Sequence, residues 1–317
     1  MGVRFLANSW PYDRWEGGDA LSRAVQTADA LGIDGWCLSE HLFTSPEHRE
    51  GFGNDTWYDP FILASHLAAR TQRIRIVFKV LVVPLRHPLH TARMAATLDV
   101  LSAGRLTLGV AAGWCEPDFR AVGVPFEARG SRTDEYLATM RSWWTDEQPS
   151  AAGTFGAFED VIAQPRCVQV PHVPLWIGGS GEPSFRRAAD FGDGWAPMPA
   201  NHSFDEAARM MRRIRERAET QGRDPGALDF VWRLGIGDPD PAMVRVHRSV
   251  HAGQDEFRSD HAHTAQEAIE AVGRFAEAGV TDLELGFAWN SPQDYEDKLR
   301  WIADAVLPGA RAAATTA

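Results

Sequence analysis

The run Ser39-Glu40-His41 places a carboxyl group beside an imidazole at the end of a predicted strand. Histidine has the side-chain pKa nearest neutrality, so His41 is a candidate general acid or base, with Glu40 beside it. The alternative is a histidine that only makes structural hydrogen bonds. The chain has 11 histidines, and most of them must be structural. Its position at a strand end is what distinguishes His41.

A glycine-rich turn follows a short apolar strand and precedes a helix; it consists of Gly178, Gly179, Ser180 and Gly181. Small residues leave backbone N–H groups uncovered, and the start of a helix adds partial positive charge. Such a turn can bind a phosphate. The alternative is a tight turn that needs glycine only for its backbone conformation.

Several tryptophans near strand ends could form the walls of a pocket for a flat ligand. Trp10, Trp114 and Trp289 are the best placed, whereas Trp195 and Trp232 more simply fill a core. Lys79 interrupts an otherwise apolar strand. A buried lysine can form a Schiff base, but the simpler expectation is that Lys79 extends to the pocket mouth or pairs with Glu40.

These candidates need a fold that brings distant strand ends together. Apolar periodicity predicts eight strands, each followed by at least one helix; the strands cover residues 3–7, 35–39, 74–82, 105–111, 175–177, 194–197, 228–236 and 281–285. Repeated βα units of this kind fit an α/β fold, the (β/α)₈ TIM barrel, with an insertion after strand 4 over about residues 115–172. A doubly wound open sheet would more often carry a Gly-x-Gly-x-x-Gly turn after its first strand, where this chain has Asn8-Ser9-Trp10-Pro11.

A barrel has its active site at the carboxyl ends of its strands, which is where these candidates lie. We expect one domain over residues 1–308, with irregular loops over 42–58 and 238–262 that shape the pocket. Residues 309–317 are expected to form a flexible C-terminal tail.

Composition excludes several classes of protein. The 317 residues are 44% hydrophobic and 24% charged, as in an ordinary globular protein. The net charge of −11 and the lack of a basic run argue against nucleic acid as a partner. No apolar run approaches the roughly 20 residues of a membrane span. Three cysteines without disulfide or metal spacing predict a cytoplasmic location and no metal site.

The centre of the chain carries the most specific pattern. Val80-Leu81-Val82-Val83-Pro84-Leu85-Arg86-His87-Pro88 leads into a helix that ends Thr97-Leu98-Asp99-Val100-Leu101-Ser102; further matching segments are 104–110, 113–114, 116–119 and 129–136. Together with the glycine-rich turn and Asp193-Gly194-Trp195, this pattern resembles the bacterial luciferase-like superfamily of flavin- and deazaflavin-dependent oxidoreductases. The resemblance extends from the first predicted strand to the last.

This resemblance implies a luciferase-like TIM barrel, usually a homodimer, that binds FMN or coenzyme F420, a deazaflavin, at the barrel mouth. The third strand would end in a bulge, often with a non-proline cis peptide, that backs the cofactor ring. The residues implied in cofactor binding are Glu40, Lys79, Val80, Leu81, Val82, Gly113, Gly178, Gly179, Ser180 and Gly181. Many members have Gly or Ser in place of Lys79.

The resemblance also implies catalytic roles. Ser39-Glu40-His41 is similar to the Ser-Asp-His run of deazaflavin-dependent dehydrogenases, in which the acid contacts the cofactor and the histidine works at the substrate. Trp10, Trp114 and Trp289 would line the substrate pocket. Sugar-phosphate dehydrogenases of the family carry a catalytic Glu where Trp114 stands, which argues against a sugar phosphate as substrate.

Four functions remain open at this stage. The favoured one is hydride transfer between coenzyme F420 and a small organic substrate. A reduced-FMN-dependent monooxygenase is the principal alternative. A Schiff-base lyase built on Lys79 and a non-catalytic cofactor-binding protein are the minor ones.

Overall fold

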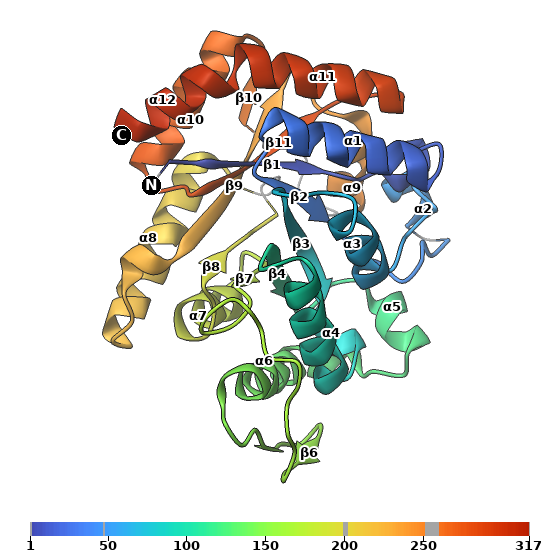
Figure 1. Ribbon diagram of the computed structural model, residues 1–317, viewed down its shortest axis with the longest axis vertical. Coiled ribbons are helices and arrows are strands. Elements are labelled where there is room, and N and C mark those ends of the chain that lie inside the picture. Colours follow the sequence, from blue (N-terminus) through green and yellow to red (C-terminus); the bar gives the residue numbers. More distant parts are fainter. Residues whose placement is uncertain (1, 47, 199–201, 251–259, 317) are drawn as a thin grey trace.

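The computed structural model describes residues 2–46, 48–198, 202–250 and 260–316. Within these residues, eight parallel strands close into a barrel in which the last strand pairs with the first (Figure 1). In order around the barrel they are β1 (Arg4–Asn8), β2 (Gly35–Leu38), β3 (Arg75–Val82), β4 (Leu106–Ala111), β7 (Leu175–Ile177), β8 (Gly194–Trp195), β9 (Asp229–Ile236) and β11 (Asp282–Phe287). The predicted (β/α)₈ TIM barrel is therefore confirmed.

Helices surround the barrel and alternate with its strands (Figure 1). They are α1 (Gly18–Leu31), α3 (Pro60–Ala68), α4 (Pro88–Leu101), α6 (Arg129–Thr145), α7 (Glu182–Asp190), α8 (Phe204–Thr220), α10 (Ala265–Glu277) and α11 (Pro292–Ala305). Local sequence sets several of their starts. The side chain of Asp59 accepts hydrogen bonds from two backbone N–H groups at the start of α3, and Ser203 forms a capping box with Glu206 at the start of α8.

The insertion after β4 contains α5 (Glu116–Ala121), α6 and a small hairpin of β5 (Ala151–Ala152) and β6 (Ala157–Phe158). In Figure 1 the hairpin lies at the lower end of the molecule. Parallel barrel strands need long crossovers, so extra residues between β4 and β7 can be accommodated outside the sheet.

The barrel interior is packed with side chains. A layer of apolar residues fills it: Leu6, Cys37, Val77, Trp176, Ala196 and Val231. Since strand side chains alternate, the residues two positions further along also face inward. Above Leu6, Val77 and Val231 these are Asn8, Lys79 and Arg233, and all three line the pocket at the barrel mouth. A polar layer therefore lies on an apolar one.

The expectation of an irregular loop over residues 238–262 is wrong for most of the described residues. They contain helix α9 (Pro241–Val250) and strand β10 (Asp260–Ala262), which pairs with β9. The side chain of Asp240 accepts a hydrogen bond from the backbone N–H of Ala242. An Asp followed by Pro at the first helical position is a start signal that could have predicted α9. Residues 251–259 lie outside the described residues.

The expected flexible tail over residues 309–317 is also wrong for residues 309–316. Helix α12 (Leu307–Thr316) packs against α10 and α11, and Leu307, Ala310 and Ala314 are buried. Alanine has the highest intrinsic helix propensity, so an alanine-rich end favours a helix where a neighbouring surface can bury it. The loop over 42–58 contains a single short helix, α2 (Arg49–Phe52), among its described residues.

Among the described residues, no helix is both long and apolar enough to cross a membrane.

Candidate functional site

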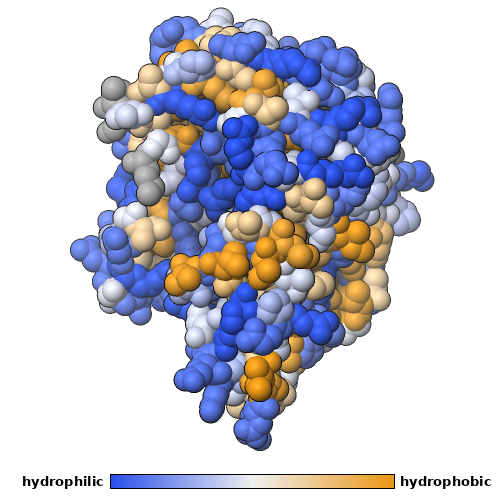
Figure 2. Space-filling view, viewed as in Figure 1, coloured by the Kyte–Doolittle hydropathy of each residue, from blue (hydrophilic) through white to orange (hydrophobic). Residues whose placement is uncertain are grey.

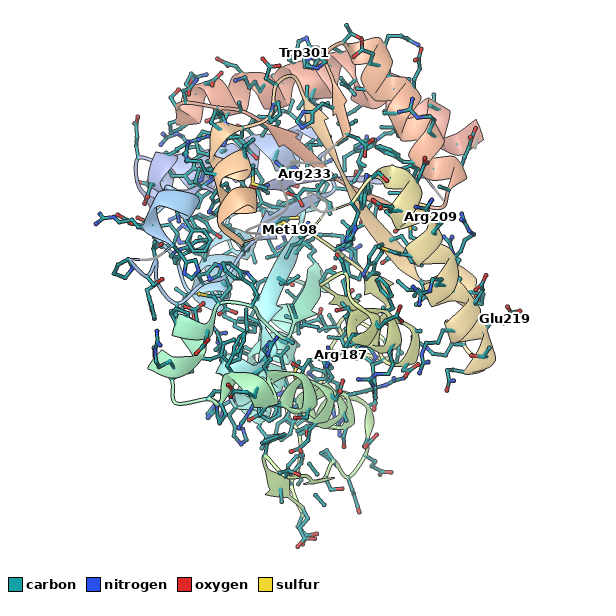
Figure 3. The ribbon with its side chains drawn as sticks, turned by 180° about the vertical axis from the view of Figure 1, so that it is seen from behind. Arg187, Met198, Arg209, Glu219, Arg233 and Trp301 are labelled. Atoms are coloured by element: carbon teal, nitrogen blue, oxygen red, sulfur yellow. The ribbon has the colours of Figure 1, made fainter. Side chains whose placement is uncertain are left out.

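A pocket of about 190 Å³ opens at the carboxyl ends of the barrel strands. Its lining comes from β1, β2, β3, β4, β9 and β11, together with the segments that follow β2, β4 and β8 and helix α9. Two of its lining residues, Met198 and Arg233, are labelled near the centre of the barrel in Figure 3. The site thus lies where the barrel fold predicts it.

His41 lines this pocket and pairs with Asp118 of α5. The His41 Nδ1 and Asp118 Oδ2 atoms lie 2.9 Å apart, and the two side chains are 11% and 2% exposed. Because an ionised carboxylate only accepts, Nδ1–H donates this bond, and proton exchange with a ligand falls to Nε2. The sequence predicted His41 but not Asp118, which comes from an element 77 positions further along the chain.

Aromatic rings hold the imidazole of His41 in place. Its ring centroid lies 4.8 Å from those of Phe52 and Trp57 and 5.4 Å from that of Trp114. All three rings line the pocket. Their packing leaves the His41 side chain only 11% exposed.

Glu40 connects the ends of two neighbouring strands. Its Oε2 accepts a hydrogen bond of 2.7 Å from the backbone N–H of Val82, and its Oε1 contacts the guanidinium of Arg86. Burial raises the pKa of Glu40, and the positive charge of Arg86 offsets only part of this rise. The structure therefore places Glu40 in the pocket wall with both oxygens engaged by the chain itself.

Of the two simpler expectations for Lys79, the pairing with Glu40 is wrong, whereas Lys79 does line the pocket at the barrel mouth. Lys79 Nζ instead lies 2.5 Å from Oε2 of Glu284 on β11, and the side-chain amide of Asn8 donates to the other oxygen of Glu284 at 2.8 Å. Burial raises the pKa of Glu284, but the positive charges of Lys79 and Arg233 outweigh this effect. The net result is a pKa lowered from 4.5 to about 2. Glu284 is thus an ionised carboxylate in the barrel interior.

The third strand ends as the family resemblance implied. The pairing of β3 with β4 shifts register between Phe78 and Leu81, and the Lys79–Val80 peptide is cis. Val80 and Val82 line the pocket, whereas Leu81 is fully buried in the outer core. At the end of β3, Val80 and Val82 thus face the pocket, and Leu81 is directed away from it.

Glycines shape the pocket wall at the ends of β3 and β4. Gly113 has a φ of +84°, and a Cβ there would lie 2.6 Å from Cγ1 of Val82. A Cβ at Gly178 would lie 3.0 Å from Cγ1 of Val80 and 3.4 Å from the Cβ of Ala111. Val80, Val82 and Ala111 all line the pocket. Because Gly113 and Gly178 have no side chains, the backbone packs directly against these three residues and they form a flat wall.

The glycine-rich turn lies behind this wall, between β7 and α7. Gly179 has a φ of +99°, which glycine adopts readily. Gly178 N–H donates to Val110 of β4, and the carbonyl of Gly179 accepts from the indole of Trp195. The turn is therefore fixed beside the pocket, with Gly181 capping α7. A phosphate on the N–H groups of residues 179–181 stays a prediction.

The structure separates the three tryptophans predicted for the substrate pocket. Trp10 and Trp114 line the pocket. Trp289 is 2% exposed, packs on Trp15 with ring centroids 4.6 Å apart, and borders a smaller neighbouring pocket. Trp195 and Trp232 are buried, as expected for core residues.

Sequence reasoning placed Asn8 and Arg233 among the candidates at strand ends without giving them a role, and it did not single out Cys115, Asp118 or Glu284 for the site. Period-two alternation from the buried Val231 would have placed Arg233 inside the barrel. His41, Cys115 and Asp118 each have a side-chain atom that could bind a metal ion, and these atoms lie within 4.8 Å of one another. The sequence predicted no metal site, and the spacing of these three residues along the chain gives no sign of their proximity.

The sequence matches the luciferase-like monooxygenase family over residues 6–306. With the barrel and the pocket at its mouth, this match shows that the chain belongs to that family. An uncharacterised protein of Mycobacterium tuberculosis is 37% identical over 238 residues, which cover 74% of this chain and 72% of that protein. An FMNH₂-dependent dimethylsulfone monooxygenase of Pseudomonas putida is 27% identical over 272 residues, covering 84% and 72% of the two chains.

Solved structures share the fold. A monooxygenase from Streptomyces bottropensis superposes with a TM-score of 0.81 at 23% identity, covering 96% of this chain and 99% of that one. An F420-dependent secondary alcohol dehydrogenase superposes with a TM-score of 0.77 at 19% identity, covering 98% and 100%. At these identities the likeness concerns the fold alone, and enzymes of both cofactor types have it.

Proposed function

We propose that this protein transfers a hydride between coenzyme F420 and a small organic substrate at the barrel mouth. The observation that carries the proposal is the His41–Asp118 pair in an aromatic-lined pocket. Hydride transfer to or from a carbon–oxygen centre requires a matching proton, and an oriented imidazole can give or take it.

The residues present fit a planar cofactor. The wall formed by Val80, Val82 and Ala111 is flat because Gly113 and Gly178 lack side chains that would crowd it. The glycine-rich turn behind that wall suits a phosphate group. A deazaflavin bound there would supply the hydride chemistry, and the protein supplies position and electrostatics.

Three groups of residues have distinct tasks in this proposal. His41 exchanges a proton with the substrate through Nε2, and Asp118 fixes the orientation of the ring. Glu40 is a positioning residue, because its bond to the N–H of Val82 holds the pocket wall. Phe52, Trp57 and Trp114 exclude water from the reacting groups.

The ion pair of Lys79 disfavours a Schiff-base lyase. Only a neutral amine can attack a carbonyl. Lys79 donates to the ionised Glu284 at 2.5 Å, and this contact stabilises the charged ammonium. Trapping with borohydride and a carbonyl substrate is therefore expected to leave Lys79 unmodified.

A reduced-FMN-dependent monooxygenase is the second candidate. The similarity to the Pseudomonas putida monooxygenase, which extends over 84% of this chain, favours it. The fixed turn and the flat wall would serve FMN as well as F420. The two candidates differ in the ring that is bound and in whether oxygen is consumed.

A fluorescence titration of the purified protein with oxidised F420 and with FMN tests the proposal. Tight binding of F420 with weak binding of FMN is the expected result. A preference for FMN, with oxygen consumption in the presence of a flavin reductase, would establish the second candidate. Binding of neither cofactor would overturn both. A homodimer and a cytoplasmic location complete the proposal.

A further inference from the structure

Arg233 is a buried cation that faces the pocket from the middle of β9. The residue is 8% exposed and lines the large pocket as well as the smaller one beside it. Its neighbours in sequence, Trp232 and Leu234, pack outward in the core between barrel and helices, so Arg233 faces inward. A Cβ at Gly286 on the adjacent strand would collide with the guanidinium, so the glycine provides its space.

Within the described residues, no side chain or carbonyl accepts a hydrogen bond from the Arg233 guanidinium, and no carboxylate forms an ion pair with it. Glu284 feels its charge but is bonded to Lys79 and Asn8. By contrast, the similarly buried Arg187 pairs with Asp134 at 2.6 Å. The guanidinium faces the pocket with five N–H donors and no acceptor from these residues, so a ligand in the pocket is expected to supply the acceptor.

The charges around Arg233 do not balance. Lys79 and Arg233 are cations, and Glu284 is the carboxylate between them. Lys79 neutralises Glu284, so among the described neighbours Arg233 remains as one excess positive charge. The immediate surroundings of Arg233 therefore favour a ligand group that brings one negative charge to the guanidinium.

The rest of the pocket is apolar and aromatic. Trp10, Phe52, Trp57 and Met243 line it together with the valines of the β3 end. A ligand that suits this environment has an apolar body and one oxyanion. A carboxylate matches the planar fork of a guanidinium with two parallel hydrogen bonds.

We infer that Arg233 binds the carboxylate of the substrate and that the substrates are organic acids with an apolar body. Arg233 is then the residue that determines substrate specificity, whereas His41 acts on the reacting carbon. This inference names the substrate class of the site and so rests on the proposed function. It does not depend on which of the two cofactors is bound.

Benzoate and benzamide are a suitable pair of probes, because they have nearly the same shape and only benzoate is charged. Calorimetric titrations at constant ionic strength would compare their binding to the wild-type protein. We expect benzoate to bind about tenfold or more tightly than benzamide, since hydrogen bonds between charged groups are the stronger kind. Equal binding of the two probes, or no binding of benzoate, would overturn the inference.

Variants assign this preference to Arg233. Arg233→Met should abolish the preference for benzoate, and Arg233→Lys, which keeps the charge but not the fork, should retain part of it. Arg209→Met removes a charge from the exposed face of α8 (Figure 3) and serves as the matched control with an unchanged preference. A benzoate preference that persists in Arg233→Met would overturn the assignment.

Cofactor titrations on the same variants separate this inference from the proposed function. Arg233→Met is expected to bind F420 or FMN with the wild-type Kd. A loss of cofactor binding with an unchanged benzoate preference would assign Arg233 to the cofactor and overturn the inference. If the wild-type protein prefers benzoate but binds neither cofactor, the proposed function fails and the anion site stands.

Discussion

At the scale of single residues, the pocket depends on polar groups from distant parts of the chain. His41 pairs with Asp118, and Lys79 pairs with Glu284. Each pair joins residues that are far apart in sequence. A substitution at one partner therefore leaves the other buried and unsatisfied, which makes both pairs accessible to experiment.

His41→Gln should lower kcat by about 10²- to 10⁴-fold on any substrate that the wild-type protein turns over, because glutamine cannot exchange a proton near neutral pH. The Kd for the cofactor should not change. His90→Gln, at an exposed position on α4, is the control. Steady-state kinetics and a cofactor titration give both values, and a wild-type kcat in His41→Gln would exclude His41 as the proton-transfer group.

Glu284→Gln tests the ionised carboxylate in the barrel. The pKa of Glu284 is lowered from 4.5 to about 2, so its contribution to stability is complete above pH 4.5 and is lost as the pH falls toward 2. The full contribution is about 3 kcal/mol, since one pKa unit corresponds to about 1.4 kcal/mol. Below pH 4.5, the free energy of unfolding measured in urea should thus fall more steeply with decreasing pH for the wild-type protein than for Glu284→Gln.

Glu219→Gln is the control for this pH series. Glu219 lies exposed near the end of α8 (Figure 3), away from the barrel interior. Its substitution should leave the wild-type pH dependence unchanged. If the free energy of unfolding changes with pH equally in the wild-type protein, Glu284→Gln and Glu219→Gln, Glu284 does not have the lowered pKa.

At the scale of elements, the pocket wall depends on how closely the ends of β3 and β4 approach. Glu40 bonds to the backbone after the β3 bulge, and Gly113 follows β4 without a side chain. Phe119 of α5 packs against the same point, where a Cβ on Gly113 would lie 2.8 Å from its ring. Two strand ends and one helix therefore set the width of the site.

Gly113→Ala should destabilise the protein and reduce cofactor binding. It combines a positive φ with contacts of 2.6 and 2.8 Å to Val82 and Phe119. Gly123→Ala is the matched control, because its φ is +70° but nothing lies within 4 Å of the added Cβ. The free energy of unfolding, measured in urea, should fall by about 1 kcal/mol in Gly123→Ala and by about 2–4 kcal/mol in Gly113→Ala. Equal losses would show that the wall tolerates a side chain.

At the scale of the whole molecule, the surface is mostly hydrophilic, but a band of hydrophobic residues crosses the face shown in Figure 2. Large apolar side chains with high exposure include Ile62 at 74% and Leu101 at 71%, on the adjacent helices α3 and α4. Exposed apolar surface of this kind is typical of proteins that associate. It is consistent with the homodimer that the family resemblance implied.

Light scattering coupled to gel filtration should therefore give a mass near twice the 35.0 kDa of one chain. The apparent mass should stay constant over a tenfold dilution into the low micromolar range, as expected for a stable interface. A mass near 35 kDa across the series would contradict the homodimer.

The sequence by itself determined the barrel and the location of its site. Alternating strand and helix periods depend on neighbouring residues, so eight strands, their order and the candidates at their ends followed from local patterns. Local patterns also placed His41 and the glycine-rich turn on one face, and the family resemblance implied the β3 bulge. The missed helices α9 and α12 had local signals as well, in the Asp240-Pro241 start and in the alanine-rich end.

Only the tertiary structure decided which partners these residues have. Lys79 pairs with Glu284 and not Glu40, because barrel closure brings β11 next to β1 and turns Glu284 inward. Asp118 reaches His41 because α5, at the start of the insertion after β4, lies at the pocket. That Arg233 has no acceptor among the described residues likewise follows only from where the folded chain places its neighbours. Such pairings join residues far apart in sequence, and local periodicity carries no information about them.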